Sequence, residues 1–259
     1  MGTRILKSDV SMSVDMSTFP EERLRQVADM ERWHFWFAGR RRLVDGLLGA
    51  YFSQNQQSVL DVGCGTGLMA EILVARGYRV SAIDLRAEGL RDVVRGRSDL
   101  RVAQANAMQL PFCDSCFDAV MLFDTLEHSD DLALLREAYR ILKPKGQLLL
   151  TVPALPWLWS YRDVAAGHQR RYTRKKLSRV LVDSGFLIAE VRYFQVLLLP
   201  ILIILRVLGR GRRQLRDLED SPPRLANVLM KRIFLLEAKL SSRLPAPIGS
   251  SLAAVGQKP

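Results

Sequence analysis

The chain has 259 residues, of which 48% are hydrophobic and 25% charged, and a net charge of +11. This composition excludes disorder over the whole length, and the length suits one α/β domain with insertions or two small domains. Three cysteines do not make a disulfide framework, which favours a reducing compartment. The first twenty residues hold no apolar segment long enough for a signal peptide, so we expect a cytoplasmic protein.

The N-terminal region divides into two parts. Residues 1–19 are polar and aperiodic, and we expect them to form a flexible arm. Residues 20–52 show helical patterns that predict an N-terminal helical cap, with Leu24, Val27 and Met30 on one face of its first helix. Its aromatic residues are expected to pack in the core, and some of them to contact a ligand as well.

Strand and helix patterns alternate along the rest of the chain, which predicts one α/β domain over residues 53–259. The predicted strands cover residues 58–61, 79–83, 100–104, 117–123, 147–152, 187–193 and 251–255. Predicted helices cover residues 68–76, 86–95, 131–142 and 173–184. We therefore expect a Rossmann-like, doubly wound parallel sheet of seven strands with helices on both faces. A helical insertion at residues 194–245 precedes the last strand.

A glycine-rich turn joins the first of these strands to the following helix. The strand ends on Asp61, and the turn reads Gly63-Cys-Gly65-Thr-Gly67. Glycines let a ligand approach the backbone closely, and the start of the helix offers N–H groups to an acceptor-rich ligand. Asp84 ends the next predicted strand, where an acidic side chain can bind both hydroxyls of a ribose. Together these residues predict a nucleotide-type cofactor.

Two cofactors compete for such a turn. A dinucleotide fingerprint spaces its glycines as G-x-G-x-x-G, whereas this turn reads G-x-G-x-G and has Leu68 where the third dinucleotide glycine belongs. Asp61 also suits the cationic amino group of S-adenosylmethionine better than a pyrophosphate. The spacing therefore favours S-adenosylmethionine over NAD.

The motifs in this order resemble the class I S-adenosylmethionine-dependent methyltransferases over roughly residues 55–195. The glycine-rich turn matches the first motif of that family, and Asp84 matches its ribose-binding acid. The segment Gln104-Ala-Asn-Ala107 is similar to the one that borders the adenine, with Asn106 where Asp is commoner. The resemblance implies that the cofactor is bound by Asp61, Gly63, Cys64, Gly65, Gly67, Asp84, Leu85, Asn106, Ala107 and Phe123.

In this fold the acceptor meets the methyl group beyond the carboxyl ends of the fourth and fifth strands. There, Asp124-Thr-Leu-Glu127-His128 is similar to the acidic-His segment of ubiquinone-type O-methyltransferases, in which such residues can hold a divalent metal. Leu-Glu-His is also widespread in class I methyltransferases, where it caps a helix or lines the pocket. We expect no metal, and we expect Glu127 and His128 to be catalytic. The motif that base-modifying N-methyltransferases carry at this place is absent, which argues against nucleic acid as a partner.

A further catalytic candidate, His168, lies in the irregular stretch after the fifth predicted strand, within Gly167-His-Gln-Arg-Arg-Tyr172. The two arginines could clamp a phosphate or carboxylate; the alternative is a surface loop with helix-capping charges. With the aromatic segment Trp33 to Phe37, this block resembles a bacterial subgroup associated with polysaccharide or glycolipid assembly. That resemblance implies acceptor-binding roles for Trp36, Arg40, Arg170, Arg171 and Tyr172.

The insertion at residues 194–245 combines apolar and basic residues. Its uncharged run from Val196 to Leu205 is too short for a transmembrane helix, which needs about 20 residues. Residues 192–259 hold twelve Lys and Arg against four Asp and Glu, a balance of +8. These features predict an element that either lies on an anionic membrane surface or packs on the sheet or on a second copy.

We therefore expect a methyltransferase that uses S-adenosylmethionine to O-methylate a small or lipid-linked hydroxyl acceptor such as a sugar. Two alternatives remain open: a non-catalytic protein that binds the cofactor or a membrane surface, and an NAD-dependent oxidoreductase, which the glycine spacing disfavours. An anionic membrane surface on the cytoplasmic side is the macromolecular partner that the sequence favours. Neither the methylated atom nor the oligomeric state follows from the sequence.

Overall fold

The structure is a computed structural model that describes residues 6–7, 21–52, 57–86, 100–208, 219–240 and 246–259. Its sheet has the order β1-β4-β3-β2-β5-β6-β8-β7. The strands are β1 (Leu6–Lys7), β2 (Ser58–Val62), β3 (Arg79–Asp84), β4 (Arg101–Gln104), β5 (Phe117–Phe123), β6 (Leu142–Pro153), β7 (Leu187–Phe194) and β8 (Ser251–Gln257). All seven predicted strands are present, and β1 adds a two-residue strand at one edge.

The sheet is mixed rather than wholly parallel. Strand β8 lies between β6 and β7 and runs antiparallel to both, with Leu149 opposite Val255 and Arg192 opposite Ala253. The pairs from β1 to β6 are parallel. The expected seven-stranded Rossmann-like sheet is therefore confirmed, while the expectation of uniform strand direction is wrong for β8. Strand β8 begins at the edge of the sheet where the parallel strands end, since Ser251 lies opposite Pro153 at the end of β6. The chain therefore enters β8 from that edge after α10 (Arg224–Leu240), which reverses the strand direction.

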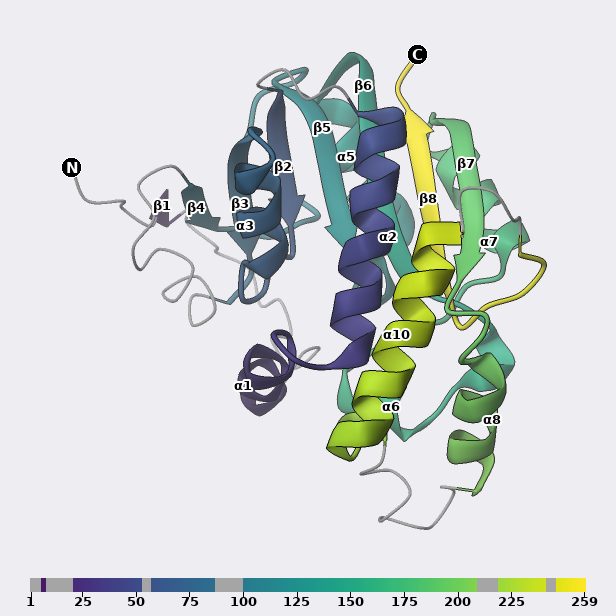
Figure 1. The fold of residues 1–259 in the computed structure, drawn as a ribbon. Coiled ribbons are helices and arrows are strands. Elements are labelled where there is room, and N and C mark those ends of the chain that lie inside the picture. The colour runs from purple at the N-terminus through teal and green to yellow at the C-terminus, as the bar shows by residue number, and fades with distance from the viewer. Residues whose placement is uncertain (1–5, 8–20, 53–56, 87–99, 209–218, 241–245) are drawn as a thin grey trace.

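Helices cover both faces of the sheet (Figure 1). On one face lie α2 (Phe35–Tyr51), α3 (Leu68–Ala75) and α10. The other face carries α5 (Asp131–Ile141) and α7 (Arg174–Asp183). Buried apolar side chains form one core cluster on each face, so the strands, whose side chains alternate between the faces, contribute to both.

Two short helical segments and three further helices complete the described chain. They are α1 (Glu21–Met30), η2 (Leu126–His128), η3 (Pro156–Leu158), α6 (Tyr161–Ala165) and α8 (Leu199–Leu208). The prediction that Thr173 caps a helix is confirmed, since its side chain accepts a hydrogen bond from the Lys176 N–H at the start of α7. The predicted helix at residues 86–95 and the expected arm at residues 1–19 lie outside the described residues, apart from Arg86, Leu6 and Lys7.

The segment Lys143-Pro-Lys-Gly146 does end the preceding helix, which stops at Ile141, but it then belongs to β6. Strand β6 therefore begins five residues before the predicted start at Gln147. Leu142 already pairs with Phe117, and the pairing shifts register before Gln147 pairs with Ala119. Pro144 and Gly146 occupy this irregular part of the pairing.

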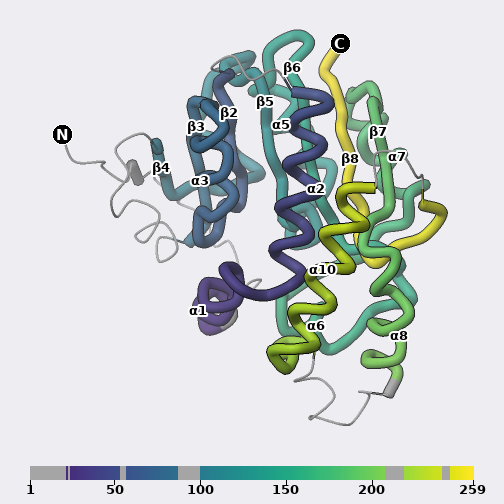
Figure 2. Tube along the Cα trace, in the orientation of Figure 1, coloured from purple at the N-terminus to yellow at the C-terminus, as the bar shows by residue number. Residues whose placement is uncertain are grey.

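The insertion before β8 is helical, as expected, and it packs on the N-terminal helix pair. Figure 2 shows α10 running beside α2 over the same face of the sheet. The Asn227 side chain ties their ends together, since it accepts from the Phe35 N–H at 2.8 Å and donates to the Trp33 carbonyl at 3.0 Å. Where the helices cross, a Cβ on Gly39 would lie 1.9 Å from the Phe234 ring, so only glycine allows this contact.

Among the described residues, we find no helix whose length and apolar content would let it cross a bilayer. Four arginines contribute to the positive charge of the insertion but lie outside the described residues, at positions 210, 212, 213 and 216.

Candidate functional site

A cavity of about 680 Å³ opens at the carboxyl ends of β2, β3, β5 and β6. Its floor includes the glycine-rich turn after β2, and its far wall comes from η2, α6 and the loop before α7. The N-terminal helices α1 and α2 and residues of α8 close the remaining sides. The volume lies within the range of about 300–1,000 Å³ that is usual for small-ligand sites.

The glycine-rich turn has the backbone shape that its sequence predicts. Gly63, Gly65 and Gly67 have φ values of +73°, +54° and +79°, which glycine adopts without strain. At Gly63 a Cβ would also lie 2.6 Å from the Thr125 methyl carbon. Gly63 and Gly65 line the cavity, whereas Gly67 does not; it forms the N-cap of α3 and orients the helix start.

Asp61 lies beneath this turn with its carboxylate directed to the cavity. It is buried, and its Oδ2 has no hydrogen-bond partner. Burial raises the pKa of Asp61 to about 7, although the nearby Arg40 guanidinium acts in the opposite direction. A buried acid of this kind is stabilised by a ligand that brings a positive charge, such as an ammonium group.

Asp84, at the end of β3, is built into the turn. Its two oxygens accept hydrogen bonds from the Gly65 N–H at 2.8 Å and the Arg86 N–H at 2.9 Å. Burial raises the pKa of Asp84, and these two hydrogen bonds oppose the rise. The carboxylate is therefore held in one orientation at the cavity wall.

The other predicted cofactor residues lie around the same end of the cavity. Cys64, Leu85, Ala107 and Phe123 line it, as does Asn106. The Asn106 side-chain oxygen accepts a hydrogen bond from the Met108 N–H at 3.0 Å, which closes the turn after β4. The structure thus brings together nine of the ten predicted cofactor residues, with Gly67 just behind them.

Arg40 and Trp36 reach the cavity from α2. The Arg40 guanidinium lies 4.6 Å from the centre of the Trp36 ring and forms an ion pair with Asp124. Asp124 follows β5 directly and has a φ of +54°, a conformation that is uncommon outside glycine and typical of functional sites. Arg40 therefore joins the N-terminal helices to the carboxyl end of the central strand.

Glu127, His128 and His168 form a cluster at the cavity wall. Glu127 is completely buried, and neither carboxylate oxygen has a hydrogen-bond partner. Burial and the charge of Asp124 raise its pKa well above the ordinary value. The His168 Nε2 lies 3.7 Å from Glu127 Oε1, and the two imidazole rings are 5.0 Å apart, edge to face. Burial and the neighbouring His168 lower the pKa of His128 to about 4, so its ring is neutral at pH 7.

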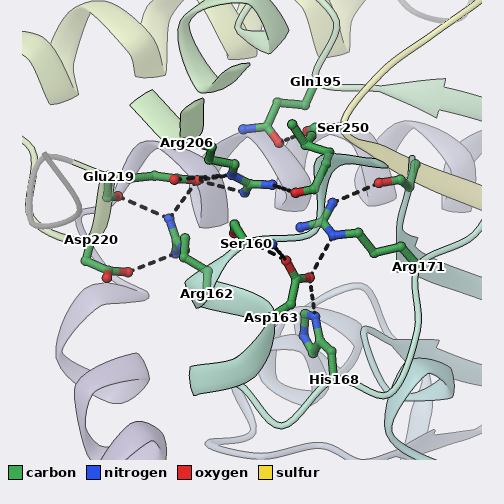
Figure 3. A network of polar contacts seen from close by, with 12 residues as sticks. Ser160, Arg162, Asp163, His168, Arg171, Gln195, Arg206, Glu219, Asp220 and Ser250 are labelled. Atoms are coloured by element: carbon green, nitrogen blue, oxygen red, sulfur yellow. Dashed lines mark hydrogen bonds and ion pairs between the residues drawn. The ribbon is translucent and has the colours of Figure 1, made fainter. Parts of the chain in front are cut away.

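A network of ion pairs and hydrogen bonds holds His168, one member of this cluster, in place (Figure 3). Asp163 lies between His168 Nδ1 at 2.9 Å and Arg171 Nε at 2.7 Å, and it also accepts from the Ser160 N–H at 2.8 Å. These contacts hold the pKa of Asp163 well below its usual range despite burial. The Arg171 guanidinium also donates to the Ala154 carbonyl at 2.8 Å.

A second group of charged side chains lines the cavity next to this network. Glu219 pairs with Arg206 at 2.8 Å and with Arg162 at 3.1 Å, and Arg162 also reaches Asp220 at 3.2 Å. Figure 3 shows Arg206 and Arg171 approaching from different elements, α8 and the loop before α7. Burial and the proximity of Arg206 lower the pKa of Arg171, and the charges of Asp163 and Glu219 oppose this.

Two predicted acceptor residues lie away from the cavity, which corrects those expectations. Tyr172 is completely buried in the core, and its hydroxyl donates to Asp131 at 3.2 Å. Arg170 donates to the Ser129 carbonyl at 2.7 Å and also lies outside the cavity wall. The physical reason is the extended backbone at this point, where successive side chains alternate in direction. Arg171 therefore faces the cavity while its neighbours do not.

Sequence reasoning missed the residues that the cavity draws from the insertion and from α6. They are Arg162 and Asp163 of α6, and Gln195, Arg206 and Glu219 of the insertion; Glu31, Thr66 and Ser250 from other parts of the chain were missed as well. The signal that could have identified Asp163 is its position five residues before His168, at a loop where a carboxylate can orient an imidazole. The others lie at scattered positions that only the folded chain brings together.

Comparisons with known proteins agree with this geometry. Residues 60–150 match the profile of a family described as methyltransferase domain. A Mycobacterium tuberculosis protein named as an S-adenosylmethionine-dependent methyltransferase is 28% identical over 165 residues, or 62% of this chain and 59% of the relative. A ubiquinone biosynthesis O-methyltransferase of Xanthomonas oryzae is 40% identical over 102 residues, 36% of this chain and 41% of that protein. The chain thus spans less than two thirds of the length of these relatives.

Solved structures share the fold. A methyltransferase structure from Bacillus halodurans has a TM-score of 0.57 and 21% identity, covering 83% of this chain and 98% of that one. The [4+2]-cyclase SpnF has a TM-score of 0.56 and 21% identity, covering 84% and 80%. At such identities the likeness concerns the fold alone. The profile match over residues 60–150, the named relatives and the cofactor end of the cavity agree: this part of the chain is similar to methyltransferase domains that use S-adenosylmethionine as the cofactor.

Proposed function

We propose that the protein transfers the methyl group of S-adenosylmethionine to a hydroxyl oxygen of a small or lipid-linked acceptor such as a sugar. The observation that carries the proposal is the continuity of one cavity between two different ends. One end has Asp61 and Asp84 at the glycine-rich turn, and the other has Glu127, His128 and His168. A donor and an acceptor can therefore meet in a shared space.

The proposed transfer is an in-line displacement, in which the acceptor oxygen attacks the methyl carbon while the carbon–sulfur bond breaks and its electrons stay on sulfur. Alignment of the two partners supplies much of the rate. The hydroxyl proton leaves to the polar cluster at the acceptor end, where a carboxylate and two imidazoles lie within reach of one another. A hydroxyl gains from such groups more than an amine does, because its proton must be removed.

Acceptor recognition is proposed for Trp36 and Arg171, which line the cavity. The guanidinium groups of Arg171 and Arg206, which both line the cavity, suit an acidic group on the acceptor, such as a phosphate or carboxylate. An acidic acceptor of this kind is compatible with the expected subgroup linked to polysaccharide or glycolipid assembly. No nucleic acid is proposed as a substrate.

The test is formation of S-adenosylhomocysteine by the full chain with a panel of glycolipids, sugars and phenols. We expect turnover with a hydroxyl acceptor, and product masses increased by one methyl group on oxygen. The variant Arg171→Gln should raise KM for an acidic acceptor, while Arg179→Gln, an exposed arginine on α7, serves as the matched control. Turnover with amines alone would contradict O-methylation. Cofactor binding without turnover of any acceptor would favour the alternative of a non-catalytic cofactor-binding protein.

A membrane-surface role is proposed beside this activity, because apolar side chains remain exposed on both helices of the insertion. Ile204 on α8 is 55% exposed, and Leu225 on α10 is 86% exposed. Arg224 and Arg232 on α10 are also exposed. Apolar and basic groups together suit an anionic leaflet, at about 1 kcal/mol for each cation near the lipid. The protein would then act as a peripheral protein on the cytoplasmic face.

Flotation with vesicles tests this role. We expect the full chain to float with vesicles containing anionic phospholipid at low salt and to remain at the bottom with neutral vesicles. The double variant Ile204→Ser/Leu225→Ser should reduce flotation, whereas Val182→Ser, at an exposed apolar position on α7, should not. Absence of binding to anionic vesicles at low salt would contradict the proposal and leave the packing of α10 on α2 as the reason for the insertion.

A further inference from the structure

The carboxylate of Glu127 is not compensated by the surrounding chain. The side chain is completely buried, and neither oxygen has a hydrogen-bond partner. A buried acid without partners is costly to the fold, and such groups in native proteins call for an explanation. Glu127 lines the cavity, so the missing partner can come from outside the chain.

Two imidazoles lie beside this carboxylate. One nitrogen of His128, one of His168 and one oxygen of Glu127 all lie within 4.8 Å of one another. Within this group, His168 Nε2 lies 3.7 Å from Glu127 Oε1. Two imidazole nitrogens and one carboxylate oxygen are a ligand set that borderline divalent cations such as Zn²⁺ prefer.

Both imidazoles are oriented through their other ring nitrogen. His128 Nδ1 lies 3.2 Å from the Gly167 carbonyl, and His168 Nδ1 lies 2.9 Å from Asp163. A proton on Nδ1 in each contact leaves the lone pair on Nε2, and such a carbonyl or carboxylate partner is what usually holds a metal-binding histidine. Arg171 in turn fixes Asp163 (Figure 3).

The three residues come from two segments that the fold joins. Glu127 and His128 belong to η2, and His168 lies forty residues later, in the loop after α6. The Gln169 N–H donates to the Glu127 carbonyl at 2.9 Å, and the Gln169 side chain donates to the His128 carbonyl at 2.8 Å, so the loop is fixed to η2. Asp124, which the sequence groups with Glu127 and His128, is instead paired with Arg40.

The nearby arginines do not prevent a cation from binding here. Arg40 pairs with Asp124, and Arg171 pairs with Asp163. Each of these positive charges therefore has its own carboxylate, and in the described chain no ion pair joins either arginine to Glu127.

We propose that Glu127, His128 and His168 form a binding site for one divalent transition-metal cation of the Zn²⁺ type. Three protein ligands leave room for an oxygen ligand from the cavity. A cation held there would lower the pKa of a bound hydroxyl, in which case the three side chains serve as its ligands rather than as proton acceptors. The site does not depend on the proposed function, because cation binding can be measured without cofactor or acceptor.

The experiment is calorimetric titration of the full, tag-free, chelator-treated chain with Zn²⁺. It uses a Cys113→Ser/Cys116→Ser background, because these two free thiols, three residues apart, could bind Zn²⁺ themselves. We expect one Zn²⁺ per chain, and much weaker binding of Mg²⁺, which prefers oxygen ligands. Glu127→Gln and His168→Gln should each weaken Zn²⁺ binding by about 100-fold, and Asp163→Asn by about 10- to 100-fold, as for other groups that orient ligands.

His34→Asn is the matched control. His34 is the one histidine of the chain outside the proposed site. It is the N-cap of α2, a position that asparagine also fills well, so Zn²⁺ binding should not change. Absence of Zn²⁺ binding in the Cys113→Ser/Cys116→Ser chain, or binding by Glu127→Gln and His168→Gln equal to that of this chain, would overturn the proposal. If those variants do not fold, carbethoxylation of the unaltered chain decides: Zn²⁺ should protect His128 and His168 but not His34, and equal modification of all three with and without Zn²⁺ overturns the site.

Discussion

Asp61 and Arg40 bring opposite charges together at the cofactor end of the cavity. Asp61 Oδ2 and Arg40 Nε are both buried and without a hydrogen-bond partner, and the charge of Arg40 acts on Asp61. The methionyl part of S-adenosylmethionine carries an ammonium and a carboxylate on one carbon. The two side chains are therefore expected to receive these two groups, which gives Arg40 a role toward the cofactor as well as the expected one toward the acceptor.

The raised pKa of Asp61 predicts a pH dependence of cofactor affinity. Below about pH 7 the Asp61 carboxyl is protonated in the free protein, while an ammonium ligand requires the ionised form. Affinity for S-adenosylmethionine should therefore fall about tenfold for each pH unit below 7 and level off above it. Calorimetry from pH 5.5 to 8.5 checks this. Asp61→Asn should bind weakly with a flat profile, and a flat profile in the unaltered chain would show that Asp61 is already ionised.

The raised pKa of Asp61 also predicts that ionisation of this carboxyl destabilises the cofactor-free protein, although it strengthens cofactor binding. Because the folded pKa lies above the ordinary value of 3.8, ionisation costs stability as pH rises from about 4 to about 7, and the full cost remains above 7. Asp61→Asn should therefore stabilise the cofactor-free protein at pH 8 and change little at pH 4. Denaturant unfolding at both pH values provides the comparison; a loss of stability at pH 8 would contradict the account.

Asp84 is expected to determine affinity for the ribose of the cofactor. Asp84→Asn keeps an acceptor for the Gly65 N–H but loses the charge, and a hydrogen bond to a charged group contributes about 1.5–3 kcal/mol. Affinity for S-adenosylmethionine should fall by roughly 10- to 100-fold. Asp45→Asn, which removes a partly exposed carboxylate paired with Arg76, is the control and should bind normally. Equal affinities in the two variants would remove Asp84 from the cofactor site.

At the scale of elements, the contact with α10 positions α2, the helix that closes the cavity on the N-terminal side. Gly39 and Phe234 form its crossing point, and Arg40, the next residue, reaches Asp124. The position of α10 therefore affects the position of a side chain in the site, although α10 itself contributes no residue to the cavity wall.

Two substitutions on the same helix test this contact. Gly39→Ala should destabilise the protein by about 1–3 kcal/mol, because its Cβ would overlap the Phe234 ring and overpacking costs about that much. Gly46→Ala has nothing within 4 Å and should stabilise α2 by up to about 1 kcal/mol. Thermal and denaturant unfolding measure both. If Gly39→Ala were stabilising as well, the two helices would not pack as described.

The elements differ in how far the sequence predicts them. Periodicity and caps predict the strands of the sheet and helices such as α3 and α7, because these signals are local. The direction of β8 and its place between β6 and β7 depend on pairing partners, which periodicity does not specify. The cofactor end of the site is also local, since one turn and Asp84 carry it. The acceptor end is not: Asp163, Arg206 and Glu219 meet only through tertiary packing, and the resemblance implied an acceptor role for Tyr172, which is buried in the core.

At the scale of the whole molecule, the cavity wall draws on segments that are far apart. Glu31 and Trp36 line the cavity beside the glycine-rich turn, and Glu31 accepts a hydrogen bond from the Thr66 hydroxyl. Arg206 and Ser250, from near the other end of the described chain, line it too. A ligand in the cavity is therefore in contact with both ends of the fold.

This arrangement predicts that cofactor binding stabilises the molecule as one unit. S-adenosylmethionine at 100 times its Kd should stabilise the folded state by about 2.7 kcal/mol and move a single thermal transition upward. Circular dichroism and tryptophan fluorescence should report the same midpoint, because Trp36 belongs to the cavity wall and the backbone signal to the whole fold. Two separate transitions, with only one of them shifted by the cofactor, would mean that the N-terminal helices fold independently of the sheet.

The central claim, that the glycine-rich turn holds S-adenosylmethionine, is tested most directly by titrating the full chain with S-adenosylmethionine and with NAD in parallel calorimetric runs. We expect one S-adenosylmethionine per chain and no heat from NAD beyond dilution, because Leu68 stands where a dinucleotide site needs its third glycine. Saturable binding of NAD together with no binding of S-adenosylmethionine would contradict the assignment of the cofactor.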